Sequence, residues 1–407
     1  MFSSDFKKLI LSRFLSTTGL QIQSVVLGWQ LYILTHSPFY LGLIGLAQAV
    51  PALGLALFSG YIVDRNRPLP IFKAVIGLMF ISNLIVVLSH YHGFHFGHTV
   101  LISSLFVSSF LVGTGRAFMH PCMFSVVPRI VDRQFSQQAS AWMTSSFQTA
   151  SISGPALGGI LFGLIGIFWT STVVSLLLIA SLGMLILFRA DLGPAHIASP
   201  DTFKKELLSG ATFVRNHPIL LPALSLDMVA VLFGGVTALL PIYAAEVLHV
   251  GPMGLGILRA APAVGAVLVS LWLTKRDIQH RAGTWLLWGV GGFGISILIF
   301  AISHSFVISL LALLASGGFD SVSAVVRTSI VQLSSPDHMR GRISAINMMF
   351  ISTSNELGEF ESGMAAALLG TIPTAVFGGV ICLVAVAGVA YFSTTLRRLN
   401  LSRLRQV

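Results

Sequence analysis

Seven of the ionisable residues inside long apolar segments of this 407-residue chain are candidates for chemistry, because a charge is costly there and therefore informative. A charged side chain near the centre of a membrane costs roughly 2.5–3.5 kcal/mol on insertion scales, so such residues mark pathways for substrates or ions. They can bind a substrate, pair with one another or exchange protons. The seven residues are Arg116, Asp227, Arg259, Asp320, Glu356, Glu359 and Glu361.

Three of these acids lie within six residues of one another. Glu356 and Glu359 share a helix face, while Glu361 points about 160° away from Glu359 at about 100° per residue. Three carboxylates this close cannot all stay ionised deep in a helix without partners, which is what a proton carrier requires. We predict that Glu356 or Glu359 exchanges a proton and that Glu361 forms a structural ion pair. Arg259 has a suitable depth to neutralise Glu361 or Glu359.

The composition shows which elements must position these charges. Only 9% of the residues are charged and 55% are hydrophobic. The mean hydropathy is +0.87, and an ordinary soluble domain is about 25% charged. The chain is therefore a polytopic membrane protein rather than a soluble enzyme. A membrane helix needs about 20 apolar residues, and twelve segments qualify: 9–34, 39–62, 70–89, 99–128, 137–162, 165–188, 218–247, 253–274, 283–303, 306–333, 343–369 and 372–395.

The distribution of basic residues sets the predicted orientation. With the amino terminus in the cytoplasm, the six external turns receive none of the 24 Lys and Arg residues, as the positive-inside rule expects. This explains the net charge of +10 without a nucleic-acid partner. We predict both termini in the cytoplasm of a bacterium, with the chain in its inner membrane. The predicted organisation is a first six-helix bundle at 1–188, a cytoplasmic linker at 189–217, a second bundle at 218–396 and a basic tail at 397–407. An amphipathic run at 203–213 in the linker is expected to lie along the membrane surface.

Two internal matches indicate that the bundles are homologous. At an offset of 204 residues, Gly154 falls on Gly358 and Arg116 falls on Asp320. At an offset of 211, QAVPALG (48–54) falls on RAAPAVG (259–265). Two pseudo-symmetric six-helix halves are typical of secondary transporters, whose site lies between the halves near the midplane. Arg116 and Asp320 are each roughly 18–21 Å from a helix end and thus at equivalent depths.

Three strings carry a resemblance to a known family. GYIVDRNRP (60–68) resembles the loop signature of the major facilitator superfamily, with Arg67 where the family usually has a second glycine. There Gly60 would allow close helix packing, Asp64 would accept hydrogen bonds from a neighbouring helix, and Arg65 and Arg67 would hold the cytoplasmic face. SGPALGG (153–159) resembles the helix 5 signature of exporters in this superfamily, with residues Gly154, Pro155, Gly158 and Gly159. RGRISAINMMFISTSNELGEFESG (340–363) resembles the branch that contains the bacterial enterobactin exporter and multidrug proteins.

The resemblance implies an all-α membrane protein that exports a small organic molecule, such as a siderophore or a drug, by proton antiport. It implies that helices 1, 4, 7 and 10 line a cavity, where Arg116 and Asp320 would form and break an ion pair. Asp227 would be either a second coupling acid or a polar lining residue. Four polar or aromatic residues are candidates for contact with substrate: Gln21, Gln23, Trp29 and Asn347.

Other functions remain open at this level. No nucleotide-binding loop is present, so we expect no cofactor and a proton gradient as the energy source. The partners are then the substrate, protons and the bilayer, and a monomer is expected. Uptake of a metabolite or metal, lipid flipping and a membrane-embedded role without transport are the alternatives. The external turn 90–98 offers weak metal ligands in His90, His92, His95 and His98.

Overall fold

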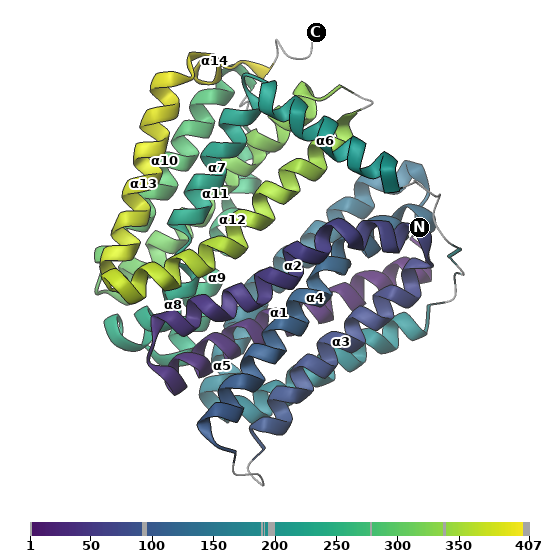
Figure 1. Cartoon of the computed structure of the whole chain (residues 1–407), viewed down its shortest axis with the longest axis vertical. Coiled ribbons are helices and arrows are strands. Elements are labelled where there is room, and N and C mark those ends of the chain that lie inside the picture. The colour runs from purple at the N-terminus through teal and green to yellow at the C-terminus, as the bar shows by residue number, and fades with distance from the viewer. Residues whose placement is uncertain are drawn as a thin grey trace. The chain divides into compact units, whose positions relative to one another are not determined.

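The computed structural model of the chain is built from helices (Figure 1). It describes residues 2–91, 96–188, 190, 192–193, 200–276, 279–336 and 339–401; of residues 57, 64, 200–207, 279 and 345 only the backbone is described. The helical elements are α1 (Ser4–Thr35), α2 (Pro38–Arg65), α3 (Pro68–Ser89), α4 (His98–Ile130), η1 (Arg133–Phe135), α5 (Ser136–Ile186), α6 (Pro200–Asn216), α7 (Leu220–Gly234), η2 (Val236–Leu239), α8 (Leu240–Ile242), η3 (Tyr243–Val247), α9 (Gly251–Leu273), η4 (Gln279–Arg281), α10 (Ala282–Ile302), α11 (Phe306–Ser334), α12 (Arg340–Leu369), α13 (Thr371–Phe392) and α14 (Thr394–Arg397).

Each of the twelve predicted spans coincides with a helical stretch once α5 is divided and the elements from α7 to η3 are taken together. Among the described residues, nine helical stretches are long and apolar enough to cross a membrane. One of them contains α5, in which Gly166 interrupts the helical backbone with φ 72° and separates two predicted spans. Such a positive φ favours glycine because it has no Cβ. The two remaining predicted spans are α1, with 32 residues, and α12, with 30.

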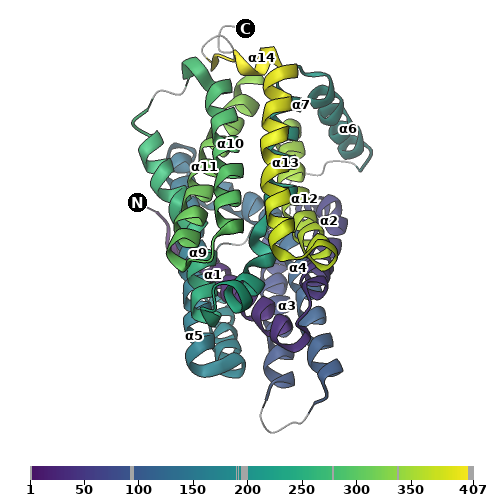
Figure 2. The same ribbon diagram turned by 90° about the vertical axis from the view of Figure 1, so that its left-hand side faces the viewer.

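The chain forms two compact units. Unit 1 comprises residues 1–198 together with 244–260, and unit 2 comprises 199–243 together with 261–407. In unit 1, α1 packs along α5 while α4 packs against α2 and α3. In unit 2, α7, α10, α12 and α13 lie side by side, and α11 packs on α10 (Figure 2). The first ten residues of α9 thus belong to unit 1, although they follow α7 in the sequence.

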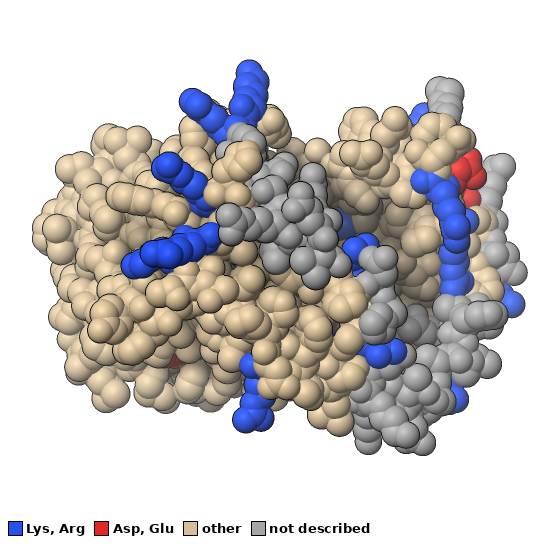
Figure 3. Space-filling model, turned by 90° about the horizontal axis from the view of Figure 1, so that it is seen from above, with Lys and Arg blue, Asp and Glu red and all other residues tan. Residues whose placement is uncertain are grey.

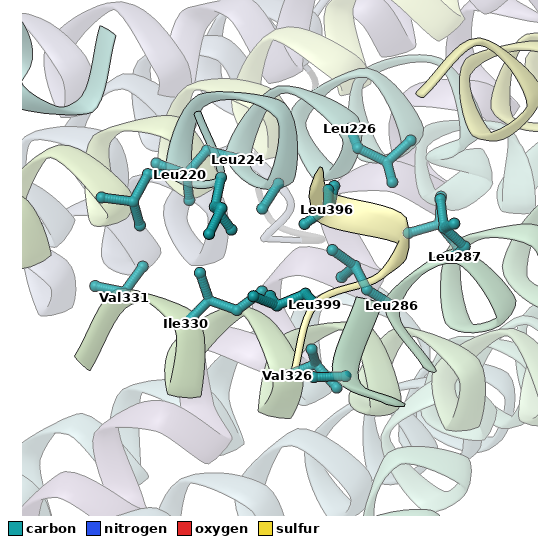
Figure 4. Packing of buried hydrophobic residues seen from close by; sticks show 14 of the residues in the cluster. Leu220, Leu224, Leu226, Leu286, Leu287, Val326, Ile330, Val331, Leu396 and Leu399 are labelled. Atoms are coloured by element: carbon teal, nitrogen blue, oxygen red, sulfur yellow. The ribbon is translucent and has the colours of Figure 1, made fainter. Parts of the chain in front are cut away.

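Each unit has its own apolar core. In unit 2 the core joins residues of α7, α10 and α11 with Leu396 and Leu399 from the carboxyl-terminal segment (Figure 4). In unit 1 it joins α1, α3, α4 and both parts of α5, with Phe72, Met79 and Leu178 among its fully buried members. In a membrane these side chains leave lipid rather than water, so their burial stabilises each unit through close van der Waals packing.

Glycine contacts repeat in the two units at the spacings found in the sequence. A Cβ at Gly113 of α4 would meet the carbonyl of Gln48 and Pro51 of α2, and a Cβ at Gly317 of α11 would meet Pro262 of α9. A Cβ at Gly154 would meet α1, and a Cβ at Gly358 would meet α7. Equivalent glycines therefore bring equivalent helices together, which supports the pseudo-symmetry inferred from the sequence.

The seventh predicted span is not one continuous helix. The α-helix ends at Gly234, and a 3₁₀ turn, a short α-helical turn and the π-helical segment Tyr243–Val247 follow. Short 3₁₀ and π segments within a span often mark functional positions. The amphipathic run predicted in the linker lies within α6. Figure 3 shows Lys and Arg side chains spread over the surface in view, with few acidic side chains among them.

Candidate functional site

A buried ion pair joins α7 to α11 in unit 2. Asp227 on α7 pairs with Arg327 on α11, and the two residues are only 5% and 6% exposed. Ser323, one turn before Arg327, donates a hydrogen bond of 3.3 Å to Asp227 Oδ1. A buried carboxylate with a guanidinium and a hydroxyl as partners is held in its ionised form. Asp227 therefore has a fixed counter-charge.

Asp320 lies on the same helix as Arg327, seven residues earlier. Its side chain is partly exposed, and within unit 2 its carboxylate makes no hydrogen bond or ion pair with another described residue. Its predicted counterpart, Arg116, lies on α4 of unit 1 with an exposed side chain. The structure describes each of these two residues within its own unit, so their pairing stays a prediction.

The three acids of α12 lie on the helix that packs beside the break in α7. Gly358 brings α12 close to the backbone carbonyls of Val231 and Leu232, and Ser362 Oγ donates to the Gly235 carbonyl at 3.1 Å. Glu356 is buried, at 6% exposed. Glu359 and Glu361 are partly exposed. The predicted proton carriers are thus on the element that caps the interrupted end of α7.

Residues 244–260 of unit 1 make three contacts with the first bundle. Tyr32 of α1 is 2% exposed and donates its hydroxyl hydrogen to the Glu246 carboxylate. Arg259 Nη1 donates to the Ser24 carbonyl at 3.0 Å. Gly256 lies against α5. The prediction that Arg259 neutralises an acid of α12 stays a prediction, and the structure also places its guanidinium against the backbone of α1.

The exporter-type string of α5 forms a backbone-to-backbone junction. A Cβ at Gly154 would lie 2.5 Å from Gln21 Cβ, and a Cβ at Gly158 would lie 3.1 Å from Ile22 Cα. A Cβ at Gly159 would lie 2.8 Å from Gly256 Cα, and a Cβ at Gly256 would lie 2.5 Å from the Pro155 carbonyl oxygen. This glycine junction therefore joins α5 to α1 on one side and to α9 on the other.

The candidate lining residues occupy different environments. Gln23 is 2% exposed and donates to Ser108 Oγ at 2.9 Å and to Ser82 Oγ at 3.3 Å, so it joins α1 to α3 and α4 inside unit 1. Trp29 is also buried, whereas Gln21 and Asn347 are partly exposed. Substrate contact is thus sterically open to Gln21 and Asn347 in this arrangement.

The loop signature 60–68 begins in the last turns of α2 and continues past its end. A Cβ at Gly60 would meet no described atom within 4 Å, so the expectation that Gly60 serves close helix packing is wrong. The Arg65 guanidinium lies 4.8 Å from the centroid of the Tyr61 ring, and Arg67 is exposed. The side chain of Asp64 lies outside the described residues, and its gating role stays a prediction.

The histidines of the external turn do not form a metal site in the part of the chain that the structure describes. No three His, Cys, Asp or Glu side chains come together among the described residues. Burial lowers the pKa of His90, whose Nδ1 lies 2.9 Å from Ser89 Oγ. His98 begins α4, and His92 and His95 lie outside the described residues.

Sequence reasoning missed Arg327, Tyr32 and Glu246 as site residues. Arg327 had a usable signal, because it follows Asp320 by seven residues and so shares its helix face. Glu246 had no such signal, because it lies at the predicted end of a span, where an acid is ordinary. Its contact with Tyr32 depends on the π-helical turn that carries it.

The interrupted seventh span, the buried charges and the two repeated units define a multi-pass membrane transporter rather than an enzyme. The family described as transmembrane secretion effector matches residues 2–404. The chain therefore belongs to this family of the major facilitator superfamily.

Relatives and solved structures agree with this assignment. The chain is 24% identical over 394 residues to the enterobactin exporter EntS of Citrobacter koseri, covering 92% of this chain and 88% of the relative. It is 23% identical over 389 residues to that of Salmonella typhi, with the same coverage. A POT family transporter in complex with 5-aminolevulinic acid has a TM-score of 0.77 at 13% identity, covering 96% of both chains. A bacterial homologue of the iron transporter ferroportin in its inward-facing state has 0.69 at 14% identity, covering 94% and 98%. These two structures show the fold.

Proposed function

We propose that the chain is a secondary active transporter that exports a small organic molecule in exchange for protons by alternating access. It acts in the bacterial inner membrane as a monomer, with both termini in the cytoplasm and without a cofactor. The substrate class is a siderophore or a drug-like molecule. Two relatives named enterobactin exporter, which are 23–24% identical to this chain, support export and this substrate class.

The glycine junction is the observation that carries the proposal. Gly159 of α5 and Gly256 of α9 bring two backbones together without intervening side chains. Contacts between small residues are favourable in membranes because they allow close van der Waals packing. Such a junction closes tightly, and it separates without side chains having to repack. Alternating access needs a helix contact with these properties.

Proton coupling is supported by the excess of buried acids. The acids within the described spans of unit 2 are Asp227, Asp320 and the three acids of α12. Away from the helix ends, Arg327 is the one Lys or Arg residue in those described spans. Acids inside a membrane span are candidates for a proton pathway. Arg116 and Asp320 are proposed to form and break an ion pair during the cycle.

The test uses purified protein in proteoliposomes with an imposed pH gradient. Lumenal pH is followed while a panel of siderophores, cationic drugs and divalent metals is offered. Proton flux would support the proposal if it requires an organic substrate and runs in the direction expected for antiport. Glu356→Gln and Glu359→Gln test the sequence-based assignment of the carrier, and empty liposomes are the control.

Other outcomes would contradict the proposal in distinct ways. Substrate movement in the same direction as the protons would indicate uptake. Flux with metals alone would indicate an ion transporter, and movement of a labelled phospholipid without proton flux would indicate lipid flipping. Substrate movement that ignores the pH gradient would remove proton coupling and leave facilitated transport.

A further inference from the structure

The charges along the α7–α11 contact do not balance. Asp227, Ser323, Arg327 and Asp320 lie on one stripe of this contact. About the axis of α11, Ser323 is about 60° and Arg327 about 20° from Asp320, at about 100° per residue. Along the axis they are about 4.5 Å and 10.5 Å away. Two carboxylates and one guanidinium therefore lie along this stripe, and the guanidinium of Arg327 is already paired with Asp227.

No neighbouring element of unit 2 supplies the missing positive charge at this depth. Asp227 is the one ionisable residue of α7, and neither α10 nor residues 261–273 of α9 contain one. The remaining neighbour, α12, contributes Glu356, Glu359 and Glu361, and its Arg340 and Arg342 lie in the first turn, about 20 Å along the axis from Glu356. The acids of α12 increase the negative excess.

We propose that Asp320 holds the exchangeable proton of unit 2 and that Arg327 and Asp227 are its positioning residues. Asp227 occupies the guanidinium, so Asp320 is neutralised by a proton instead. Asp320 is partly exposed, whereas Asp227 and Arg327 are buried, so Asp320 is the more accessible of the two acids. This inference rests on the proposed proton coupling and moves the carrier from α12 to α11.

Counting charges predicts the behaviour of four variants. Wild type has two carboxylates and one guanidinium, and binds one proton. Asp320→Asn leaves one of each and binds none. Asp227→Asn also binds none, because Arg327 becomes available to Asp320. Asp227→Asn combined with Arg327→Gln leaves Asp320 alone and restores the proton, which persists to higher pH than in wild type.

The experiment is an infrared pH titration of the full chain in lipid nanodiscs without substrate. The readout is the carbonyl band of a protonated carboxylic acid, with circular dichroism as a control for folding. We expect the titrating band to be lost in Asp320→Asn and Asp227→Asn and to return in the double variant. The double variant is decisive because it keeps Asp320 and removes both Asp227 and Arg327, so a protonated Asp320 leaves no net charge at this contact. Its result can be read even where Asp227→Asn alone folds poorly.

Several results would overturn the inference. The band would survive in Asp320→Asn if another acid held the proton, and its loss in Glu356→Gln or Glu359→Gln alone would return the carrier to α12. A folded double variant without the band would mean that Asp227 itself is the carrier. Failure of the proposed function is distinguishable, since the expected bands without substrate-dependent proton flux would leave the Asp320 assignment intact and remove the coupling.

Discussion

The glycine junction makes a quantitative prediction for stability. In Gly159→Ala the new methyl group would lie 2.8 Å from Gly256 Cα and against the Pro252 carbonyl oxygen. Both are backbone atoms, so neither can rotate away, and α9 must move from α5. Overpacking of this kind costs about 1–3 kcal/mol, while replacing a glycine inside a helix by alanine recovers about 0.5–1 kcal/mol. The expected net loss is about 1–2 kcal/mol.

A matched control lies in the second part of the same helix. A Cβ at Gly183 would meet no described atom within 4 Å. Gly183→Ala should therefore be neutral or stabilise the chain by up to about 1 kcal/mol, because only the helix propensity changes. Gly256→Ala occupies the other side of the junction, and combining it with Gly159→Ala should be non-additive because both methyl groups push the same two helices apart.

The assay is reversible unfolding in mild detergent micelles by titration with a denaturing detergent. The intrinsic fluorescence of the 6 tryptophans reports the transition. A free energy of unfolding for Gly159→Ala equal to that for Gly183→Ala would refute the junction. If Gly159→Ala and Gly183→Ala lower the free energy of unfolding by a similar amount, the loss comes from replacing a glycine in this helix and not from the contact with α9.

Three further predictions concern the other polar contacts. Arg327→Gln should lower the free energy of unfolding by about 3–5 kcal/mol because it leaves Asp227 buried without its counter-charge, and the addition of Asp227→Asn should recover most of that loss in the same detergent titration. Tyr32→Phe should lower the unfolding free energy by about 1 kcal/mol by removing a hydrogen bond to the exposed Glu246, a loss absent when Glu246→Gln is already present. His217 accepts hydrogen bonds at its Nδ1 from the backbone amides of Ile219 and Leu220 at the start of α7, and burial lowers its pKa. Its contribution to stability should thus be complete above about pH 6.5 and be lost as pH falls through the lower folded pKa, a dependence absent in His217→Asn.

Most of the fold followed from hydropathy because the bilayer imposes span length directly. The predicted spans and the observed helices agree to within a few residues, and the repeat predicted which glycines bring helices together. Two features did not follow. The interruption after Gly234 lies within an unbroken apolar run, and the reversal at Gly166 joins two spans without a polar loop. Periodicity in a span that is apolar all round does not show where the backbone bends.

The sequence predicted which ionisable residues belong to the candidate site more accurately than it predicted their interaction partners. Hydropathy identified Asp227 and Glu356 as buried charges, since each one interrupts an apolar segment, but Arg327 was missed. Pairing depends on the rotation of each helix about its axis, which a mostly apolar sequence specifies weakly. Asp227 therefore pairs with Arg327, four positions after a serine that also contacts it, and the guanidinium of Arg259 donates to a backbone carbonyl of α1.

The two described positions at which the chain passes between units coincide with irregular helix geometry. One passage, between Tyr243 and Ala244, lies within the π-helical segment Tyr243–Val247. The other, between Ala260 and Ala261, lies directly before Pro262 in α9. A proline removes one backbone hydrogen bond of its helix, and a π segment shifts the bonding register, so both reduce the cost of bending. In this structure residues 244–260 contact the first bundle through Tyr32, Ser24 and the glycine junction, with a deformable segment at each end. A transporter that moves two rigid bundles needs its connections to bend at a few positions, and this chain provides them where membership changes from one unit to the other.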